Sequence, residues 1–444
     1  MDWLRRAAHQ HPDRPAVAVG GSSLVYGELD GLADRVAAAV RGAGPVLGAR
    51  VAYWGEGSLR AVAAAWGVPR SGAWAVPLST DLPAAAAMDL TRAARVRGLW
   101  ALGSDADLEG LRPAEPVERG GPDDPEARFV VFSSGTEGAP RGIVLTGGNV
   151  AAAVAASRRL LGNGPGDRWL CVLPTSHVGG LSILWRSAEA AGTVLLEERF
   201  DAGRVAGILA GGEAEYASLV PTMLQRVLAA HPGPYEGVKA VLVGGGPADP
   251  RLVERALDAG LPVLTTYGST ETCSQVATVA PGEERLSLGT VGRPLDGLEV
   301  RIGATGRIEV RGPAVAEETV EGRFREAADW LETGDLGGFD EDGRLVVEGR
   351  ADRVIVTGGL NVDPEAVEAV LAGHPAVGDV RVIGEPDPEW GTAVVAEVVP
   401  APGVRWDEAA VAGWARRRLG GARTPKRWRT VARIDRTALG KHRS

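Results

Sequence analysis

The sequence predicts an α/β protein with a second, small α+β domain at its C-terminal end. Short apolar strands alternate with amphipathic helical patterns along most of the chain, which is typical of sheets covered by helices. A chain of 444 residues is also too long for one ordinary hydrophobic core. We therefore expect a larger domain over 1–351 and a smaller one over 352–444.

Strands of the larger domain end in runs of glycine and hydroxyl residues. Three strands show this. Strand 129–132 is followed by Ser133, strand 239–243 is followed by Gly244, and strand 263–266 ends at Tyr267. A helical pattern at 251–259 separates the last two strands, so this region is predicted to be a βαβ unit. Because ligands bind beyond the carboxyl ends of strands in open α/β sheets, these polar runs mark the candidate site.

The smaller domain begins with a short strand, 354–356, and a Gly-Gly turn. A helix follows, because Asp363 can cap its N-terminus, Pro364 suits the first turn and Glu365 suits the helix dipole. The remaining elements expected here are strands at 380–383 and 393–399 and a helix at 408–419.

Composition excludes several classes of protein. The net charge is −9 and no basic block is interleaved with aromatic residues, so nucleic acid is not an expected partner. The two cysteines, Cys171 and Cys273, form no CxxC pair, which argues against a zinc site or a disulfide framework. No signal peptide and no apolar run long enough to span a membrane is found, so we expect a cytoplasmic protein without a membrane partner.

The first candidate constellation is a phosphate-binding loop. It consists of Ser133, Ser134, Gly135, Thr136 and Arg141. Glycines let backbone N–H groups approach phosphate oxygens, hydroxyls donate hydrogen bonds, and the cation neutralises charge. The run lacks the GxxxxGK[ST] pattern of a P-loop NTPase. By itself it also fits a flexible surface turn.

The second constellation runs from Tyr267 through Gly268, Ser269 and Thr270 to Glu271. An aromatic ring at a strand end can stack on a purine, and a Thr hydroxyl can donate to a phosphate. A carboxylate beside phosphates suggests a bound Mg²⁺. The alternative is a helix N-terminus capped by Ser269 or Thr270.

Two further features lie towards the C-terminus. Asp335 follows Thr333-Gly334 and can accept hydrogen bonds from ribose hydroxyls, and Arg350 can add a donor. Asp335 alone also fits an ordinary turn. Lys441, in the run 437–441, fits a solvated tail when it is considered alone.

In this order and spacing, the four features resemble the adenylate-forming superfamily, which includes acyl- and aryl-CoA ligases, luciferases and peptide-synthetase adenylation domains. The resemblance covers the whole chain. It implies a large N-terminal domain of mixed sheets sandwiched by helices, and a small, mobile α+β C-terminal domain. It also implies an ATP-dependent acid–thiol ligase that uses ATP, Mg²⁺ and coenzyme A and acts on a small carboxylic acid. A homodimer is compatible with it.

The resemblance assigns roles residue by residue. Lys441 would bridge the acid and the α-phosphate, Glu271 would hold Mg²⁺, and Asp352 would be the hinge. The other assignments are Thr136 and Thr270 to the phosphates, Tyr267 and Gly244, Gly245 and Gly246 to the adenine, Asp335 and Arg350 to the ribose, and Gly358 and Gly359 to the thiol tunnel.

Within the superfamily the chain most resembles the 2-succinylbenzoate–CoA ligases of menaquinone biosynthesis. The runs 169–174, 177–187, 220–224 and 270–276 carry this resemblance. For the acid we select His177, Ser269 and Arg186, the last of which would pair with a second carboxylate. Alternatively, His177 is a wall residue and Arg186 lies solvated on a helix.

The phosphate loop departs from the family pattern, which usually has Thr and Lys where this chain has Glu137 and Arg141. Arg141 keeps the charge but is bulkier and forked, whereas Glu137 adds negative charge near phosphates. These two residues favour the alternative of a degenerate nucleotide-binding protein. Two enzyme alternatives also stay open: another aryl- or acyl-CoA ligase, and a stand-alone adenylation enzyme that loads a carrier protein.

Overall fold

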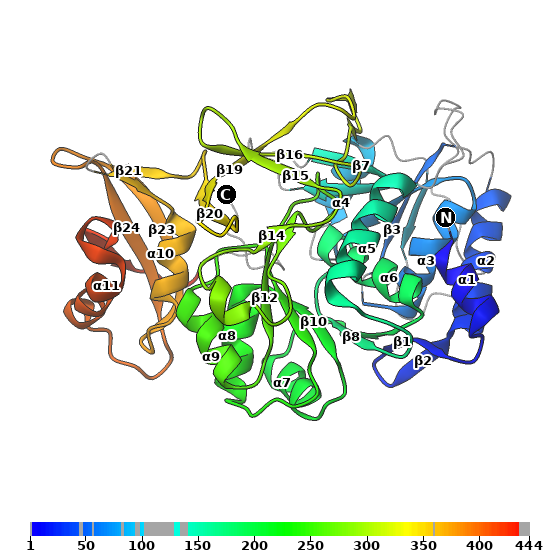
Figure 1. Cartoon of the computed structure of the whole chain (residues 1–444), viewed down its shortest axis with the longest axis horizontal. Helices are drawn as coiled ribbons and strands as arrows, with labels where there is room; N and C mark the ends of the chain where they lie inside the picture. The colour runs from blue at the N-terminus through cyan, green and yellow to red at the C-terminus, as the bar shows by residue number, and fades with distance from the viewer. Residues whose placement is uncertain are drawn as a thin grey trace.

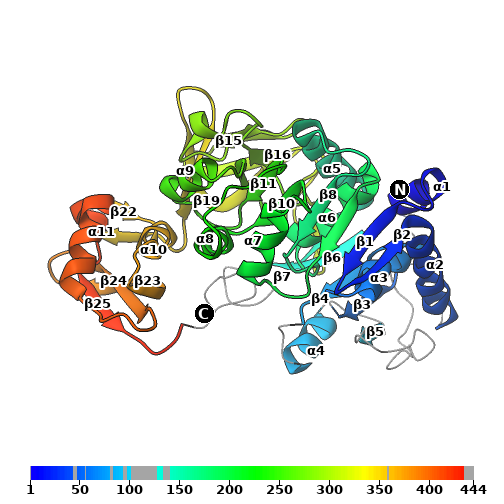
Figure 2. The ribbon, with the colours of Figure 1, turned by 90° about the horizontal axis from the view of Figure 1, so that it is seen from below.

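A computed structural model describes residues 2–43, 48–55, 57–80, 84–93, 98–101, 128–133, 141–357 and 360–434. A large N-terminal domain carries the helices α1 to α9, and a smaller C-terminal domain lies at the end of the molecule farthest from the N-terminus (Figure 1, Figure 2). The predicted fold class is confirmed.

One mixed sheet of the large domain is parallel at its centre, from β9 through β8, β10 and β11 to β12. In sheet order its strands are β14 (Arg293–Pro294), β13 (Ala277–Thr278), β12 (Val263–Tyr267), β11 (Ala240–Val243), β10 (Tyr216–Leu219), β8 (Arg168–Cys171), β9 (Thr193–Leu196), β1 (Pro15–Val19) and β2 (Ser22–Val25). The pairing of β11 with β12 around α9 confirms the predicted βαβ unit.

A second mixed sheet carries the strand that runs into the candidate phosphate loop. Its order is β18 (Gly322–Arg323), β17 (Glu318–Thr319), β7 (Arg141–Thr146), β6 (Arg128–Ser133), β4 (Trp74–Leu78), β3 (Arg50–Trp54) and β5 (Gly98–Ala101). β6 and β7 form an antiparallel pair in which Ser133 lies opposite Arg141. The two residues that flank the candidate phosphate loop are therefore paired in one antiparallel ladder.

Helices cover these sheets. They are α1 (Trp3–Gln10), α2 (Tyr26–Gly42), α3 (Leu59–Arg70), α4 (Ala84–Ala93), α5 (Gly147–Leu161), α6 (Val178–Ala190), α7 (Ala202–Ala210), α8 (Pro221–Ala230), α9 (Pro250–Asp258) and the 3₁₀ helix η2 (Glu284–Ser287). Helices α7, α8 and α9 share one core with β10 and β11. Helices α5 and α6 belong to the larger core, which includes residues from both sheets.

A third, antiparallel sheet leads to the C-terminal domain. It has the order β15 (Glu299–Ile302), β16 (Arg307–Arg311), β19 (Leu331–Phe339) and β20 (Leu345–Arg350). The C-terminal domain then contains β21 (Ile355–Thr357), β22 (Leu360–Val362), α10 (Pro364–Leu371), β23 (Val377–Asp387), β24 (Gly391–Pro400), α11 (Glu408–Arg423) and β25 (Arg427–Thr430). It has its own hydrophobic core, and Asp363 caps α10 as predicted by accepting a hydrogen bond from Glu365 N.

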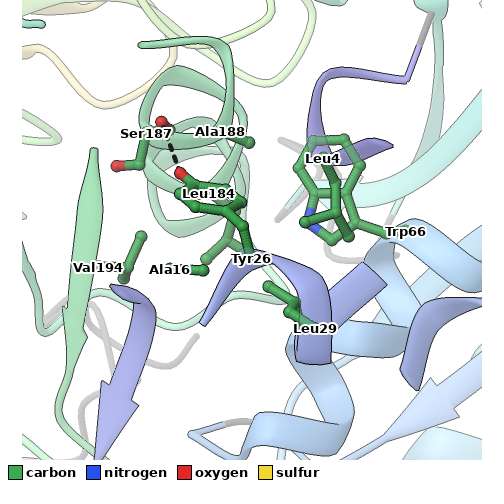
Figure 3. A pocket seen from close by; sticks show the side chains of 9 residues that line it. All are labelled: Leu4, Ala16, Tyr26, Leu29, Trp66, Leu184, Ser187, Ala188 and Val194. Carbon is green, nitrogen blue, oxygen red and sulfur yellow. Dashed lines mark hydrogen bonds between the residues drawn. The ribbon is translucent and has the colours of Figure 1, made fainter. Parts of the chain in front are cut away.

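An apolar pocket between α1, α2 and α6 belongs to the core (Figure 3). Tyr26 points into it, and its hydroxyl donates to the Ser187 carbonyl at 3.2 Å. The void is about 10 Å³, which is at the lower limit for one water molecule. It is therefore a packing gap.

In the part of the chain that the structure describes, no helix has the length and apolarity needed to cross a membrane.

Candidate functional site

The glycine run after β11 lies against the end of β12. A Cβ added to Gly244 would lie 2.8 Å from the Thr266 carbonyl oxygen, and Gly245 has a φ of +78°. A side chain at Gly244 would clash with backbone, and the φ of Gly245 favours glycine. The sequence therefore brings bare backbone to the carboxyl edge of the sheet.

Tyr267 ends β12 and contacts the third sheet. Its hydroxyl lies 2.7 Å from Asp335 Oδ2 and 3.3 Å from Thr333 Oγ1. Arg350 lies opposite Asp335 in the register of β19 and β20, with its Nη1 3.9 Å from Asp335 Oδ1. Burial, and next the Asp335 charge, raise the pKa of Tyr267 well above its usual value. The hydroxyl thus stays protonated and donates to the carboxylate.

The turn 268–275 after Tyr267 contains no helix, so the alternative of a capped helix N-terminus is wrong. A Cβ on Gly268 would lie 1.5 Å from the Ser274 carbonyl oxygen. Because this oxygen belongs to the backbone, movement of a side chain cannot relieve the clash. Cys273 and Ser274 have φ values of 50° and 95°. Such left-handed backbone is strained for residues with side chains and is found preferentially at functional sites.

Glu271 and Thr270 lie on this turn, half buried. The Glu271 backbone carbonyl accepts from Ala316 N at 2.7 Å, which fixes its position. Among the described residues, no cation or hydrogen-bond donor contacts the Glu271 carboxylate. The carboxylate is available to a ligand.

Helix α6 presents His177 and Arg186. His177 is the half-buried N-cap residue of α6, and its side chain makes no capping hydrogen bond. Arg186 lies two turns further along and is 3% exposed. The alternative that Arg186 is solvated is therefore wrong.

Arg186 is a buried cation without a carboxylate. Its Nη2 donates to Ser182 Oγ at 2.5 Å and lies 3.4 Å from Ser274 Oγ, and its Cζ lies 5.1 Å from the Trp169 ring. Within the described residues, Nη1 has no hydrogen-bond partner. Burial lowers the pKa of Arg186 to about 10, with thiols rather than carboxylates as the ionisable groups nearby.

Several polar residues of this site were missed when individual site residues were selected from the sequence. Ser182 and Ser274 contact Arg186, with 3.4 Å between their hydroxyls. Gln275 holds the turn in place, because Ser157 Oγ donates to its Oε1 at 2.7 Å and its Nε2 donates to Thr278 at 2.8 Å. A serine four residues before an arginine on one helix was the available signal for Ser182, but this spacing is too common to be specific.

The remaining predicted residues are partly described. Ser133 ends β6 and Arg141 begins β7 on the two sides of the candidate phosphate loop, and Arg141 Cζ lies 5.2 Å from the Phe324 ring. Asp352 accepts two hydrogen bonds from Arg350, at 3.0 Å and 3.2 Å. Outside the described residues lie Ser134, Gly135, Thr136, Glu137, Gly358, Gly359 and Lys441.

The described site thus combines three parts around the turn 268–275. An aromatic ring, a carboxylate and bare backbone lie at the sheet edge, a free carboxylate lies on the turn, and a buried cation lies behind it.

Residues 4–318 match the family model of the AMP-binding enzymes, and residues 366–441 match the model of their C-terminal domain. The chain belongs to the AMP-binding enzyme family.

Among its AMP-binding relatives is the 2-succinylbenzoate–CoA ligase of Bacillus licheniformis, with 34% identity over 99% of this chain and 98% of the relative. The o-succinylbenzoate CoA synthetase (MenE) of Bacillus subtilis, in complex with the acyl-adenylate intermediate OSB-AMP, has a similar structure. The identity is 30%, 100% of this chain and 96% of the other are covered, and the TM-score is 0.87. The prediction of an adenine-nucleotide enzyme is confirmed.

A second structure of that Bacillus subtilis synthetase allows a comparison of conformations. A double mutant bound with its product analogue OSB-NCoA has 30% identity over 99% of this chain and 97% of the other, but a TM-score of 0.72. Since both structures are of essentially one protein, the two TM-scores reflect different conformations. The AMP-binding enzyme described here is closer to the acyl-adenylate complex.

Proposed function

We propose that this AMP-binding enzyme joins 2-succinylbenzoate to coenzyme A through an acyl-adenylate. In the first step a carboxylate oxygen bonds to the α-phosphorus of ATP and pyrophosphate leaves. In the second step the sulfur of coenzyme A bonds to the acyl carbon, the thiol proton is released, and AMP leaves. Names of similar proteins support this substrate, and one feature of the site supports it independently.

That feature is the unpaired Arg186. A buried charge without an opposite charge is costly, so proteins rarely retain one without a function. 2-Succinylbenzoate has two carboxylates, and one of them remains free when the other is activated. A charge-assisted hydrogen bond from Arg186 Nη1 to that free carboxylate would satisfy both groups. The hydroxyls of Ser182 and Ser274, which contact Nη2, would complete a polar pocket for it.

The nucleotide would bind at the sheet edge. Gly244 to Gly246 and the Tyr267 ring frame the adenine in this proposal, and Asp335 and Arg350 hold the ribose. Thr270, with the phosphate loop of Ser133, Ser134, Gly135, Thr136 and Arg141, would contact the phosphates.

Magnesium would enter as MgATP. In the described part of the chain, no group of three or more His, Cys, Asp or Glu side chains is arranged to hold a metal. The half-buried Glu271 carboxylate is unpaired there, so it fits a single protein ligand to an ion that phosphate oxygens also bind. The ion would neutralise charge as the acid approaches the phosphate.

Two further assignments concern the acid and the second step. His177 and Ser269 would lie beside the acid, and Lys441 would bridge its carboxylate and the α-phosphate. We place the boundary between the domains at 351–352 with Asp352 as the hinge, and Gly358 and Gly359 on the path of the thiol.

The proposal is tested by acid-dependent exchange of pyrophosphate into ATP, followed by thioester formation with coenzyme A. 2-Succinylbenzoate should support both reactions, and the two analogues that each lack one carboxylate should be poorer substrates. Exchange with 2-succinylbenzoate equal to that without any acid would contradict the proposal.

Arg186→Met tests the assignment of the second carboxylate. It should lower the preference for the diacid over the monoacid that keeps the reacting carboxylate by about 10- to 150-fold, the range of a hydrogen bond to a charged group. The exposed Arg226 on α8 gives a matched control, because Arg226→Met also removes a guanidinium and should leave the preference unchanged. An unchanged preference in Arg186→Met would show that another residue recognises the diacid.

A further inference from the structure

A side chain of the N-terminal domain holds one end of a helix in the C-terminal domain. Gln225 lies half buried on α8, and its Nε2 donates a hydrogen bond of 2.5 Å to the carbonyl oxygen of Ala372. The two residues are 147 positions apart in the sequence. Figures 1 and 2 both show α10 beside α8. The contact therefore depends on the orientation of the two domains.

The acceptor is a carbonyl at the C-terminal end of a helix. Ala372 is the C-cap residue of α10, and the last carbonyls of a helix have no partner within the helix. Val370 and Leu371 accept from Gly373 N and His374 N. Gln225 donates a hydrogen bond to the Ala372 carbonyl. This is the C-terminal end of α10, where the helix dipole is negative and a hydrogen-bond donor is favoured.

The other end of α10 lies against the hinge segment. A Cβ added to Gly349 would lie 2.4 Å from Asp363 Cγ, so the α10 cap packs directly on the backbone at the end of β20. Arg353 Nη1 pairs with Glu365 Oε1 on the first turn at 2.8 Å. Helix α10 is about 12 Å long at 1.5 Å per residue. A rotation at the hinge moves its far end most and breaks the contact with Gln225.

We propose that Gln225 is a positioning residue that holds the C-terminal domain in the orientation used to form the acyl-adenylate. This inference rests on the proposed function, and on the greater similarity of the whole structure to the acyl-adenylate complex described above. Release of Gln225 from Ala372 accompanies the rotation that precedes thioester formation. Gln225 acts through the domain orientation and is not a catalytic residue.

Gln225→Met tests the proposal, because methionine keeps the approximate volume and helix propensity and removes the donor. Acid-dependent pyrophosphate exchange should fall about two- to tenfold, the effect of losing one hydrogen bond. Thioester formation from supplied acyl-adenylate should stay the same or rise. Gln225→Lys, which returns a donor to the helix C-terminus, should restore the exchange. Ala229→Met, one turn further along the exposed side of α8, is the control.

The ratio of the two half-reactions separates positioning from a general structural effect. Equal loss of both half-reactions in Gln225→Met, or no change in either, would overturn the proposal. If the unaltered protein catalyses no exchange, the proposed function fails. Tryptic cleavage at the exposed Arg353, next to the proposed hinge, then tests the contact between Gln225 and Ala372 alone. Faster cleavage in Gln225→Met than in Ala229→Met supports the contact, and equal cleavage overturns it.

Discussion

The hydroxyl of Tyr267 donates a hydrogen bond of 2.7 Å to Oδ2 of Asp335 and so connects two different sheets. Tyr267 ends β12 in the large mixed sheet, and Asp335 lies on β19 in the antiparallel sheet that leads to the C-terminal domain. The ring proposed for the adenine thereby orients the carboxylate proposed for the ribose.

Tyr267→Phe should weaken ATP binding while keeping the ring. Without the hydroxyl, Asp335 loses the donor that fixes its orientation, so the concentration of ATP for half-maximal exchange should rise about two- to tenfold. The measurement is acid-dependent pyrophosphate exchange over a range of ATP concentrations. Tyr235→Phe is a matched control, because the Tyr235 hydroxyl donates to the His231 carbonyl. An unchanged ATP requirement in Tyr267→Phe would contradict this role.

Gly268→Ala should destabilise the protein strongly. The added Cβ would lie 1.5 Å from a backbone oxygen, so the turn that carries Glu271 would have to move, at a cost of about 3 kcal/mol or more. Denaturant unfolding measures the free energy of unfolding. Gly207→Ala, at an exposed position of helix α7 with open space around it, should stabilise by about 0.5–1 kcal/mol. Equal free energies of unfolding for Gly268→Ala and Gly207→Ala would contradict this prediction, because they would show that the turn accommodates a side chain at little cost.

Asp363→Asn should change how stability depends on pH. Burial, and next the Glu365 charge, raise the pKa of Asp363 from 3.8 to about 7. Because the folded state holds this proton more tightly, the stabilisation is complete below pH 4 and is lost as the pH rises through 7. Asparagine caps the helix equally well and has no charge. The melting temperature of Asp363→Asn minus that of the unaltered protein should therefore increase between pH 5 and pH 8.

The control for this effect is Asp407→Asn, which changes the exposed cap of α11 in the same way. It isolates the effect of the cap substitution itself. A difference in melting temperature that is constant with pH for Asp363→Asn would mean that this carboxylate is ionised throughout.

Lys441→Ala should separate the two half-reactions of the AMP-binding enzyme. If Lys441 bridges the acid and the α-phosphate only in the first step, adenylate formation should fall by several orders of magnitude, because charge crowding is the main barrier. Thioester formation from supplied acyl-adenylate should continue. Rapid-quench assays of each step measure both rates. Equal loss in both steps would refute this division.

Local sequence chemistry predicted the α/β class and the strands that end at the site. β11, α9 and β12 have the expected order, because β11 is apolar throughout, β12 begins with Val263 and Leu264, and a glycine follows each strand. It also predicted the capped start of α10. Alternation and capping depend on neighbouring residues only, so they are visible in the sequence.

Only the tertiary structure decided which polar residues are buried, paired or left unpaired. Helix α6 is buried on nearly all sides, so helical periodicity does not reveal that Arg186 is enclosed. The contacts of Tyr267 with Asp335 and of Gln225 with Ala372 join residues 68 and 147 positions apart. Such pairs depend on how sheets and domains pack, and packing is a property of the whole chain rather than of any segment.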